Sequence, residues 1–367
     1  MDELVLLREM LEIHSPSGKE EEMAAYLVTQ MRALGFHAYQ DPAGNAIGVL
    51  AGADKACPEP CPERRLRRAQ SSRRRGSRRE IVLLGHMDTV EGFIPVRLQD
   101  GRLYGRGAVD AKGALATFIL AAARVGPLPD KRIVVVGAVE EETASKGARY
   151  LVGNFSPQMA VIGEPSGWQH VTLGYKGRLL VTYRLAAPTR HSTAQGPSAS
   201  ERAVEFWNRL TDYARQFNRG ERFRFHTLDP SLRRISTHNV SFEEEVTMDM
   251  TLRIPFGLDV PSLKEHMREW AEGAAVGFSG EDVPYKAGKN NPLVRAFLRA
   301  IRARGGRPTF KLKLGTSDMN TVGPVWGCPI VAYGPGDSSL DHTPDEHIHV
   351  QEFYQAIEVM TEVIRDA

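Results

Sequence analysis

The chain has 367 residues, of which 42% are hydrophobic and 25% charged. This is the composition of an ordinary globular protein, and it excludes disordered, collagen-like and coiled-coil classes. The three cysteines, Cys57, Cys61 and Cys328, are too few for a disulfide framework or a four-thiolate zinc site. The acidic N-terminal stretch lacks a signal-peptide pattern, and the longest apolar run, Ala114–Ala123, is about half the roughly 20 residues of a membrane span. We therefore expect a soluble cytoplasmic protein that makes no membrane contact.

The formal net charge of +2 hides a concentrated basic segment at 54–79. This segment has ten basic and three acidic residues, a local charge of +7, so the rest of the chain carries −5. Its prolines and arginines, with almost no apolar side chains, predict a mobile surface loop between two strands. A frame-shifted stretch of GC-rich coding DNA would have the same composition, and sequencing the gene would decide between them.

The predicted elements alternate in the first part of the chain. Helical spacing of apolar residues predicts helices over 3–13 and 20–34. Short apolar runs then predict strands at 46–50, 81–84, 133–139 and 160–162, with one helix at 111–125 that is apolar nearly all round and therefore buried. This alternation favours a parallel sheet covered by helices, with polar side chains gathered just after the strands.

The pattern changes after residue 170. Half-solvated antiparallel strands are predicted at 171–185, 235–242 and 246–253, with amphipathic helices at 201–216 and 262–275. The α/β pattern resumes with a helix at 292–304, a strand at 328–333 and a helix at 350–364. We predict an α/β catalytic domain in two parts, 1–173 and 289–367, interrupted by a smaller α+β domain at 174–288, with Gly174 and Gly177 as hinge positions.

Polar residues capable of metal chemistry follow the first predicted strands. His86 and Asp88 end the strand that begins near residue 81, and their spacing lets both side chains face the same way. An imidazole ligand needs its second nitrogen held by an acceptor, which a carboxylate two positions on supplies. Asp110, flanked by glycines, opens the buried helix; a helix cap is the simpler reading, but its two oxygens could each bind one metal ion.

Three further acidic or histidine-rich stretches lie beyond later strands. Glu140, Glu141 and Glu142 repel one another at a strand end unless cations neutralise them, although such a run is usually a solvated loop. Glu164 follows another strand, and 341–347 holds two histidines among acids. No stretch is convincing alone, but together they offer nitrogen and oxygen ligands without thiolates. That set suits two divalent ions such as zinc, which activate a water and polarise a carbonyl together.

The order of these five motifs resembles the co-catalytic di-zinc amidohydrolases that include aminoacylase, acetylornithine deacetylase and succinyl-diaminopimelate desuccinylase. The resemblance covers nearly the whole chain apart from 54–79, and it implies a zinc-peptidase-like catalytic domain with a mixed sheet covered by helices, interrupted by a smaller lid and dimerisation domain. It also implies two Zn²⁺ ions, replaceable by Co²⁺, and a homodimer. The implied metal ligands are His86, Asp110 and Glu164 for one ion and Asp110, Glu142 and His342 for the other.

The same resemblance assigns roles to residues around the ions. Asp88 would orient His86, and Glu141 would be the general base that takes a proton from the attacking water. The usual Asp-Glu-Glu of the family is Glu140-Glu141-Glu142 here, which leaves the last two roles intact. In the inserted domain, His191 would reach across the dimer towards the substrate carbonyl. The implied substrate-binding residues are Asn239, Arg253, Thr316 and Ser317, for which ordinary strand and turn chemistry is the alternative.

Within this family, Gly-Ala-Val-Asp110-Ala-Lys-Gly and Gly174-Tyr-Lys-Gly-Arg are most similar to the members that release lysine or ornithine from a small acidic amino-group carrier protein in lysine and arginine biosynthesis. Such a carrier requires a basic docking surface. No acidic residue lies between 291 and 317, a stretch that contains a row of cations. They are Arg295, Arg299, Arg302, Arg304, Arg307, Lys311 and Lys313. A solvated helix face is an equally good explanation of this row.

Two other functions remain open at this stage. A deacylase acting on free acetyl-lysine or acetylornithine would share every catalytic residue. A nucleic-acid-binding protein using the arginine-rich segment is a different class, but this segment lacks interleaved aromatic residues and belongs to no recognisable nucleic-acid-binding fold. We therefore do not expect a nucleic-acid partner.

Overall fold

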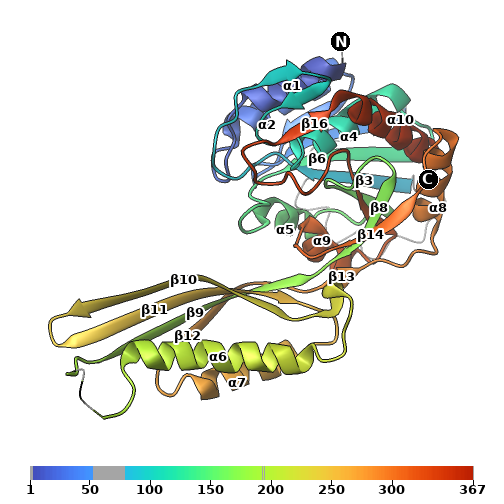
Figure 1. Cartoon of the computed structure of the whole chain (residues 1–367). Coiled ribbons are helices and arrows are strands. Elements are labelled where there is room, and N and C mark those ends of the chain that lie inside the picture. The colour runs from blue at the N-terminus through green and yellow to red at the C-terminus, as the bar shows by residue number, and fades with distance from the viewer. Residues whose placement is uncertain (1–2, 53–78, 192, 194, 367) are drawn as a thin grey trace. The chain divides into compact units, whose positions relative to one another are not determined.

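The computed structural model describes residues 3–52, 79–191, 193 and 195–366 (Figure 1). The arginine-rich segment predicted at 54–79 lies outside the described residues except for Arg79, which begins a strand. The chain divides into two compact units. The first unit comprises Met1–Leu173, Ala287–Lys311 and Thr321–Ala367, and the second comprises Gly174–Lys286 and Leu312–Asn320. Residues 312–320, which the sequence analysis leaves in the catalytic domain, group with the second unit.

The first unit is built on a mixed sheet with the strand order β1-β2-β6-β3-β7-β15-β8-β13, in which β13 (Tyr285–Lys286) pairs with the last two residues of β8; β14 also pairs with β8. Strands β3, β6, β7 and β15 are parallel, while β1, β2 and β8 run antiparallel to their neighbours. A wholly parallel sheet is therefore wrong, and the mixed sheet implied by the resemblance is confirmed. The strands are β1 (His37–Gln40), β2 (Ala46–Ala51), β3 (Arg79–His86), β6 (Lys131–Ala138), β7 (Met159–Gly163), β8 (His170–Tyr175), β14 (Thr309–Lys313) and β15 (Ile330–Tyr333).

Helices cover this sheet, and a small second sheet lies beside it (Figure 1). The helices are α1 (Glu3–Glu12), α2 (Glu21–Ala33), α4 (Lys112–Val125), α5 (Lys146–Val152), α8 (Pro292–Ala303), α9 (Asp318–Trp326) and α10 (Val350–Asp366). The small sheet has the order β16-β5-β4, from β4 (Arg97–Gln99), β5 (Arg102–Tyr104) and β16 (His347–His349). None of the helices among the described residues has the length and apolarity that crossing a membrane would need.

The helix predicted at 111–125 is the centre of the first core. As α4, it is buried from Lys112 to Ala122 because the strands β3 and β6 lie on one side and α1 and α10 on the other. The facing strands are continuous apolar runs, as expected for strands covered on both faces. This packing fixes the start of α4, and with it the loop that carries Asp110, against the centre of the sheet.

The parallel strands end together at one edge of the sheet. Gly85 of β3 is in register with Gly137 of β6 and with Gly163 of β7. The residues that follow these glycines therefore emerge side by side, and they include His86 and Glu164. The predicted gathering of polar side chains after the strands is confirmed for this edge.

The second unit is an antiparallel sheet with helices on one face (Figure 1). Its strand order is β10-β11-β9-β12, and the burial of β11 alternates along most of its length, as a half-solvated strand requires. Helix α6 packs against β9, β10 and β11, and α7 packs against β12. The elements are β9 (Gly177–Pro188), α6 (Ala199–Phe217), a 3-10 turn (Arg224–His226), β10 (Asp229–Val240), β11 (Glu243–Ile254), α7 (Val260–Trp270), β12 (Ala275–Asp282) and β13 (Tyr285–Lys286).

Two predicted elements of this unit are wrong in their extent. The predicted helix 262–275 ends at Trp270, because Glu272 and Gly273 adopt left-handed backbone conformations with φ of 50° and 92°, and strand β12 follows. The predicted strand 171–185 is two strands that separate at Lys176. The Lys176 side chain is buried, and its Nζ donates to the carbonyl of Arg224 at 3.0 Å and to Asp229 Oδ2 at 2.7 Å.

Gly174 and Gly177 are required by close packing of the backbone. A Cβ at Gly177 would lie 2.3 Å from the carbonyl oxygen of Asp282, and one at Gly174 would lie 2.6 Å from that of Tyr285. Both obstacles are main-chain atoms of neighbouring segments, which cannot rotate away as a side chain does. The two glycines therefore mark close approach of strands within the second unit.

Replacing Gly177 by alanine should lower the free energy of unfolding by about 1–3 kcal/mol, because the methyl group must displace backbone. Gly153→Ala is the matched control, since φ there is −84° and nothing lies within 4 Å of the added Cβ. Urea unfolding measures both variants. Equal stability of the two would contradict the close-packing explanation.

Candidate metal centre

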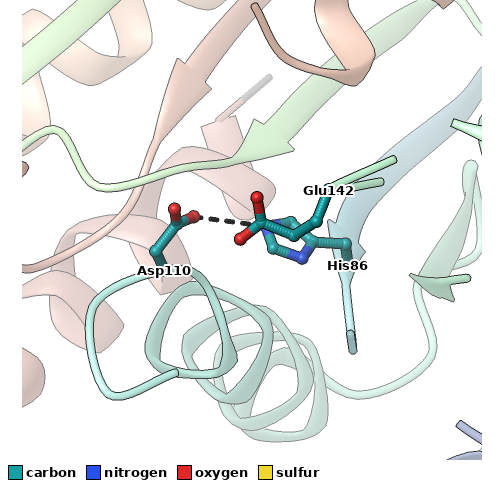
Figure 2. Close-up of side chains that lie close together, drawn as sticks. All are labelled: His86, Asp110 and Glu142. Atoms are coloured by element: carbon teal, nitrogen blue, oxygen red, sulfur yellow. Dashed lines mark hydrogen bonds and ion pairs between the residues drawn. The ribbon is translucent and has the colours of Figure 1, made fainter. Parts of the chain in front are cut away.

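His86 ends strand β3 with its imidazole buried and both ring nitrogens facing oxygen atoms. Its Nε2 lies 3.3 Å from Asp110 Oδ1 (Figure 2). Its Nδ1 lies 3.0 Å from the main-chain oxygen of Asp88 and 3.4 Å from Oδ1 of the same residue. Burial opposes protonation, but the hydrogen bonds to Asp110 and Asp88 outweigh it and raise the pKa of His86 well above its usual value. The imidazole is therefore oriented with Nε2 towards Asp110.

Asp110 lies between two imidazoles. Its Oδ1 faces His86, and its Oδ2 lies 3.2 Å from Nε2 of His342, which lies 232 residues further along the chain. The peptide bond between Asp110 and Ala111 is cis, and helix α4 starts at Lys112. Each carboxylate oxygen thus serves a different histidine, as a ligand shared by two metal ions would.

Glu142 completes the cluster. Its Oε1 lies 3.2 Å from His342 Nε2, and ligand atoms of His86, Asp110 and Glu142 lie within 4.8 Å of one another (Figure 2). Burial raises the pKa of the Glu142 carboxyl. The hydrogen bonds to Asp110 and Glu142 raise the pKa of His342 to about 10. Negative charge therefore concentrates at this point and attracts protons or cations.

Asp88 holds the loop that carries the glutamates. Its Oδ1 accepts a hydrogen bond from the backbone N–H of Glu141 and its Oδ2 one from that of Glu142, both at 3.1 Å. Ser17 donates its hydroxyl to Oδ2 at 2.6 Å. Burial disfavours the charged carboxylate, but hydrogen bonds from His86 and Ser17 offset it and lower the pKa of Asp88. One buried carboxylate therefore contacts His86 and both neighbouring glutamates.

Glu164 and Glu141 lie at the same strand-end edge. Glu164 is buried directly after β7. Its place in register is beside His86, because Gly85 pairs with Gly163 in the parallel ladder. Glu141 is half-buried on the loop after β6, between Glu140 and Glu142. Glu140 of the same loop pairs with Lys146 at 2.8 Å.

The donor set and its spacing fit divalent metal ions. Imidazole nitrogens and carboxylate oxygens without a thiolate suit zinc and similar ions. Two ligand atoms about 2.0–2.1 Å from one tetrahedral zinc ion stand about 3.3 Å apart. The separations from Asp110 to His86 and to His342, 3.3 and 3.2 Å, match that value on both sides of one carboxylate. The residues present could therefore hold two ions with Asp110 between them.

The remaining predicted site residues belong to the second unit. His191 is exposed, and its Nδ1 lies 2.8 Å from Thr193 Oγ1. Asn239 is exposed on β10. Arg253 on β11 approaches Thr316 Oγ1 with its Nη1 at 3.4 Å, and burial lowers its pKa. Ser317 is buried, and its Oγ accepts from the backbone N–H of Met319 at 3.2 Å. Within this unit, Arg253 and Thr316 lie together, and the predicted roles of all five residues stay predictions.

Three residues around the cluster are missing from the sequence analysis. Ser17 binds Asp88, and the buried pair Arg106 and Glu346 binds the loop before Asp110. Glu346 follows His342 in an acid-rich stretch and Arg106 lies between two glycines, so each reads as a surface residue in isolation. Arg106 and Glu346 share one signal in the sequence, which is a charged residue four positions from a predicted ligand, whereas Ser17 has no such signal.

Comparison with known proteins gives a family match. The family model described as Peptidase family M20/M25/M40 matches residues 82–366. A LysW-lysine hydrolase from Deinococcus radiodurans is 40% identical over 98% of this chain and 95% of its own. A putative LysW-lysine/LysW-ornithine hydrolase from Pyrococcus furiosus is 38% identical over 99% of this chain and 96% of its own.

Solved structures agree with the fold. A tripeptidase from Staphylococcus aureus has a TM-score of 0.76 at 18% identity, covering 99% of this chain and 97% of its own. A dinuclear metal-binding peptidase from Bacillus subtilis has a TM-score of 0.65 at 14% identity, covering 98% and 96%. The predicted family and fold class are confirmed. This chain belongs to peptidase family M20/M25/M40 and is a metal-dependent amide hydrolase.

Proposed function

We propose that this protein releases lysine or ornithine from a small acidic amino-group carrier protein by hydrolysing an amide bond. The observation that supports the chemistry best is the position of Asp110, because one of its carboxylate oxygens contacts His86 and the other contacts His342. The names of the relatives support the substrate, since hydrolases of LysW-linked lysine or ornithine are 36–40% identical over nearly the whole chain. Two Zn²⁺ ions, or Co²⁺ in their place, are the proposed cofactors, held by His86, Asp110, Glu142, Glu164 and His342.

In the proposed mechanism each residue has one task. The ions, when bound, would polarise the amide carbonyl and lower the pKa of a water. Glu141 takes the proton from the attacking water and passes it to the leaving amine, as a general base that becomes a general acid. Asp88 holds His86 and the backbone of Glu141 in place through Oδ1, and the backbone of Glu142 through Oδ2.

The second unit supplies the proposed substrate contacts. His191, reaching across a homodimer, donates to the oxyanion that develops on the carbonyl. Arg253, a cation whose burial lowers its pKa, binds the carboxylate of the amino acid together with Thr316. Asn239 and Ser317 are further proposed contacts. The homodimer is part of this proposal, and sedimentation of the purified protein tests it.

The substrate assignment is tested by measuring release of free amino acid from purified carrier-lysine and carrier-ornithine conjugates, with and without a chelator. Acetyl-lysine and acetylornithine serve as free acyl substrates. We expect kcat/KM to be highest for a carrier conjugate and turnover to stop with the chelator. A higher kcat/KM on the free acyl compounds would show that the substrate is a small molecule and not a carrier conjugate. Turnover that survives metal removal would refute the mechanism.

The proposed docking surface for the carrier includes three unpaired arginines. Arg299 and Arg304 of the cationic row are already paired with acids of α10, at 3.1 Å to Asp366 and 2.6 Å to Glu358. Three other exposed arginines have no acidic partner within the part of the chain that the structure describes. They are Arg295, Arg302 and Arg307. The charges of these three arginines are therefore available to an acidic partner.

Electrostatic docking predicts that KM for carrier-linked lysine rises steeply with salt while KM for a small acyl-lysine does not. The triple variant Arg295→Gln, Arg302→Gln, Arg307→Gln should raise KM for the carrier conjugate by roughly three-fold to 150-fold, the range expected for the loss of three exposed ion pairs. The small substrate is the internal control, because it needs no docking surface. Equal salt dependence of the two substrates would remove the docking surface from the proposal.

A further inference from the structure

Glu346 is a fully buried carboxylate that binds the loop in front of Asp110 at several points. Its Oε1 accepts hydrogen bonds from the backbone N–H of Val109 at 2.9 Å and of Asp110 at 3.1 Å. Its Oε2 accepts one from Arg106 Nη1 at 2.7 Å. The main-chain oxygen of Glu346 accepts from Gly105 at 3.3 Å. All three oxygen atoms of this residue therefore accept hydrogen bonds from residues 105–110.

Arg106 anchors the other side of this contact. Its Nε donates to the carbonyl of Gly92 at 3.1 Å, and the residue is only 8% exposed. A buried carboxylate paired with a buried guanidinium is costly to desolvate, so it stabilises the fold weakly compared with well-packed apolar residues. Its benefit is directional: Arg106 holds Oε2 of Glu346, and Oε1 then sets the position of two consecutive backbone N–H groups.

Glu346 also links two parts of the cluster that are far apart in sequence. It lies four residues after His342, and it holds the backbone of Asp110 itself. Asp110 Oδ2 and His342 Nε2 are 3.2 Å apart. A shift of either loop would change this separation, and with it the spacing that two metal ligands need.

We infer that Glu346 is a positioning residue, which with Arg106 fixes Asp110 relative to His342 so that the shared carboxylate can serve two ions. This inference rests on the proposed metal-dependent function. Removing a group that holds a metal ligand in place without contacting the metal itself weakens metal binding by about 10- to 100-fold. A residue that only stabilised the fold would leave metal affinity unchanged.

The test measures zinc binding by titration calorimetry, thermal unfolding of the metal-free protein, and kcat for full-length variants. Glu346→Ala removes all side-chain contacts. Glu346→Gln keeps the shape but turns a donor towards Arg106 or towards the backbone N–H groups, and it serves if the alanine variant does not fold. We expect both variants to bind zinc about 10- to 100-fold more weakly and to lose kcat at fixed metal concentration.

Lys131→Met is the matched control. Lys131 is buried at the start of β6, the end opposite to the cluster, and its Nζ donates to the carbonyls of Ile364 and Arg365 at 3.0 and 2.6 Å. The Lys131→Met variant should have a lower unfolding temperature, like Glu346→Gln, but its zinc affinity should be unchanged. If Glu346→Gln binds zinc like wild type with unchanged kcat, the positioning role is wrong. If the wild-type protein itself binds no zinc, the proposed metal-dependent function is wrong, whatever the role of Glu346.

Discussion

Glu141→Gln should lower kcat by about 10²- to 10⁴-fold while the protein still binds its metal ions. The glutamine keeps the size of the side chain but cannot take a proton from the attacking water, and that range is the usual contribution of a general base. The Glu141 side chain is half-buried beside Glu142, and its backbone is held by Asp88. The substitution therefore leaves the loop and the cluster of ligands in place. Single-turnover kinetics and metal analysis measure the two effects separately.

Glu140→Gln is the matched control for this prediction. It removes the same charge from the neighbouring position, but Glu140 pairs with Lys146 at 2.8 Å. We expect its kcat to stay within a few-fold of wild type. Near-normal kcat in Glu141→Gln would show that another group is the base, and loss of metal from this variant would assign Glu141 to the ligand set.

Removing the metal ions with a chelator should abolish turnover and lower the unfolding temperature. Asp110 and Glu142 lie close together, and burial raises the pKa of Glu142, so the cluster needs compensating positive charge. Ions that bind the folded chain alone stabilise it by mass action, about 2.7 kcal/mol at a free concentration 100 times Kd. Activity and calorimetric scans, before and after adding Zn²⁺ or Co²⁺, measure the effect.

Asp110→Asn is the companion variant for the metal prediction. It keeps the shape of the side chain but removes the charge that faces His86 and His342. We expect this variant to show little gain in unfolding temperature on adding zinc and to have no measurable turnover. An unchanged response to zinc would mean that the ions bind elsewhere in the chain.

Local sequence patterns predicted the strands that lead to the cluster. The apolar runs near 81, 133 and 160 become β3, β6 and β7, because a strand covered on both faces needs consecutive apolar residues. Helix α4, which follows Asp110, was predicted equally clearly, because a helix that is buried on all sides is apolar nearly all round. The strands β12 and β14 were missed, since their largely exposed, mixed side chains carry no such pattern.

Charge patterns were harder to interpret than apolar ones. The cationic row at 295–313 has no acid within it, yet Arg299 and Arg304 are paired with α10, which follows nearly fifty residues later. An ion pair between distant segments leaves no periodic trace in either of them. The unpaired arginines could therefore be identified only once α8 and α10 were placed.

By itself, the sequence determined the family, the alternation of strands and helices, and the candidate ligands, because these depend on residue types at short spacings. The tertiary structure decided which groups meet. Asp110 contacts both His86 and His342, Asp88 accepts a hydrogen bond from the backbone of Glu141, and Glu346 accepts one from the backbone of Asp110. These contacts join segments up to 236 residues apart. Their distances depend on how whole strands and helices pack, which no local pattern of residues specifies.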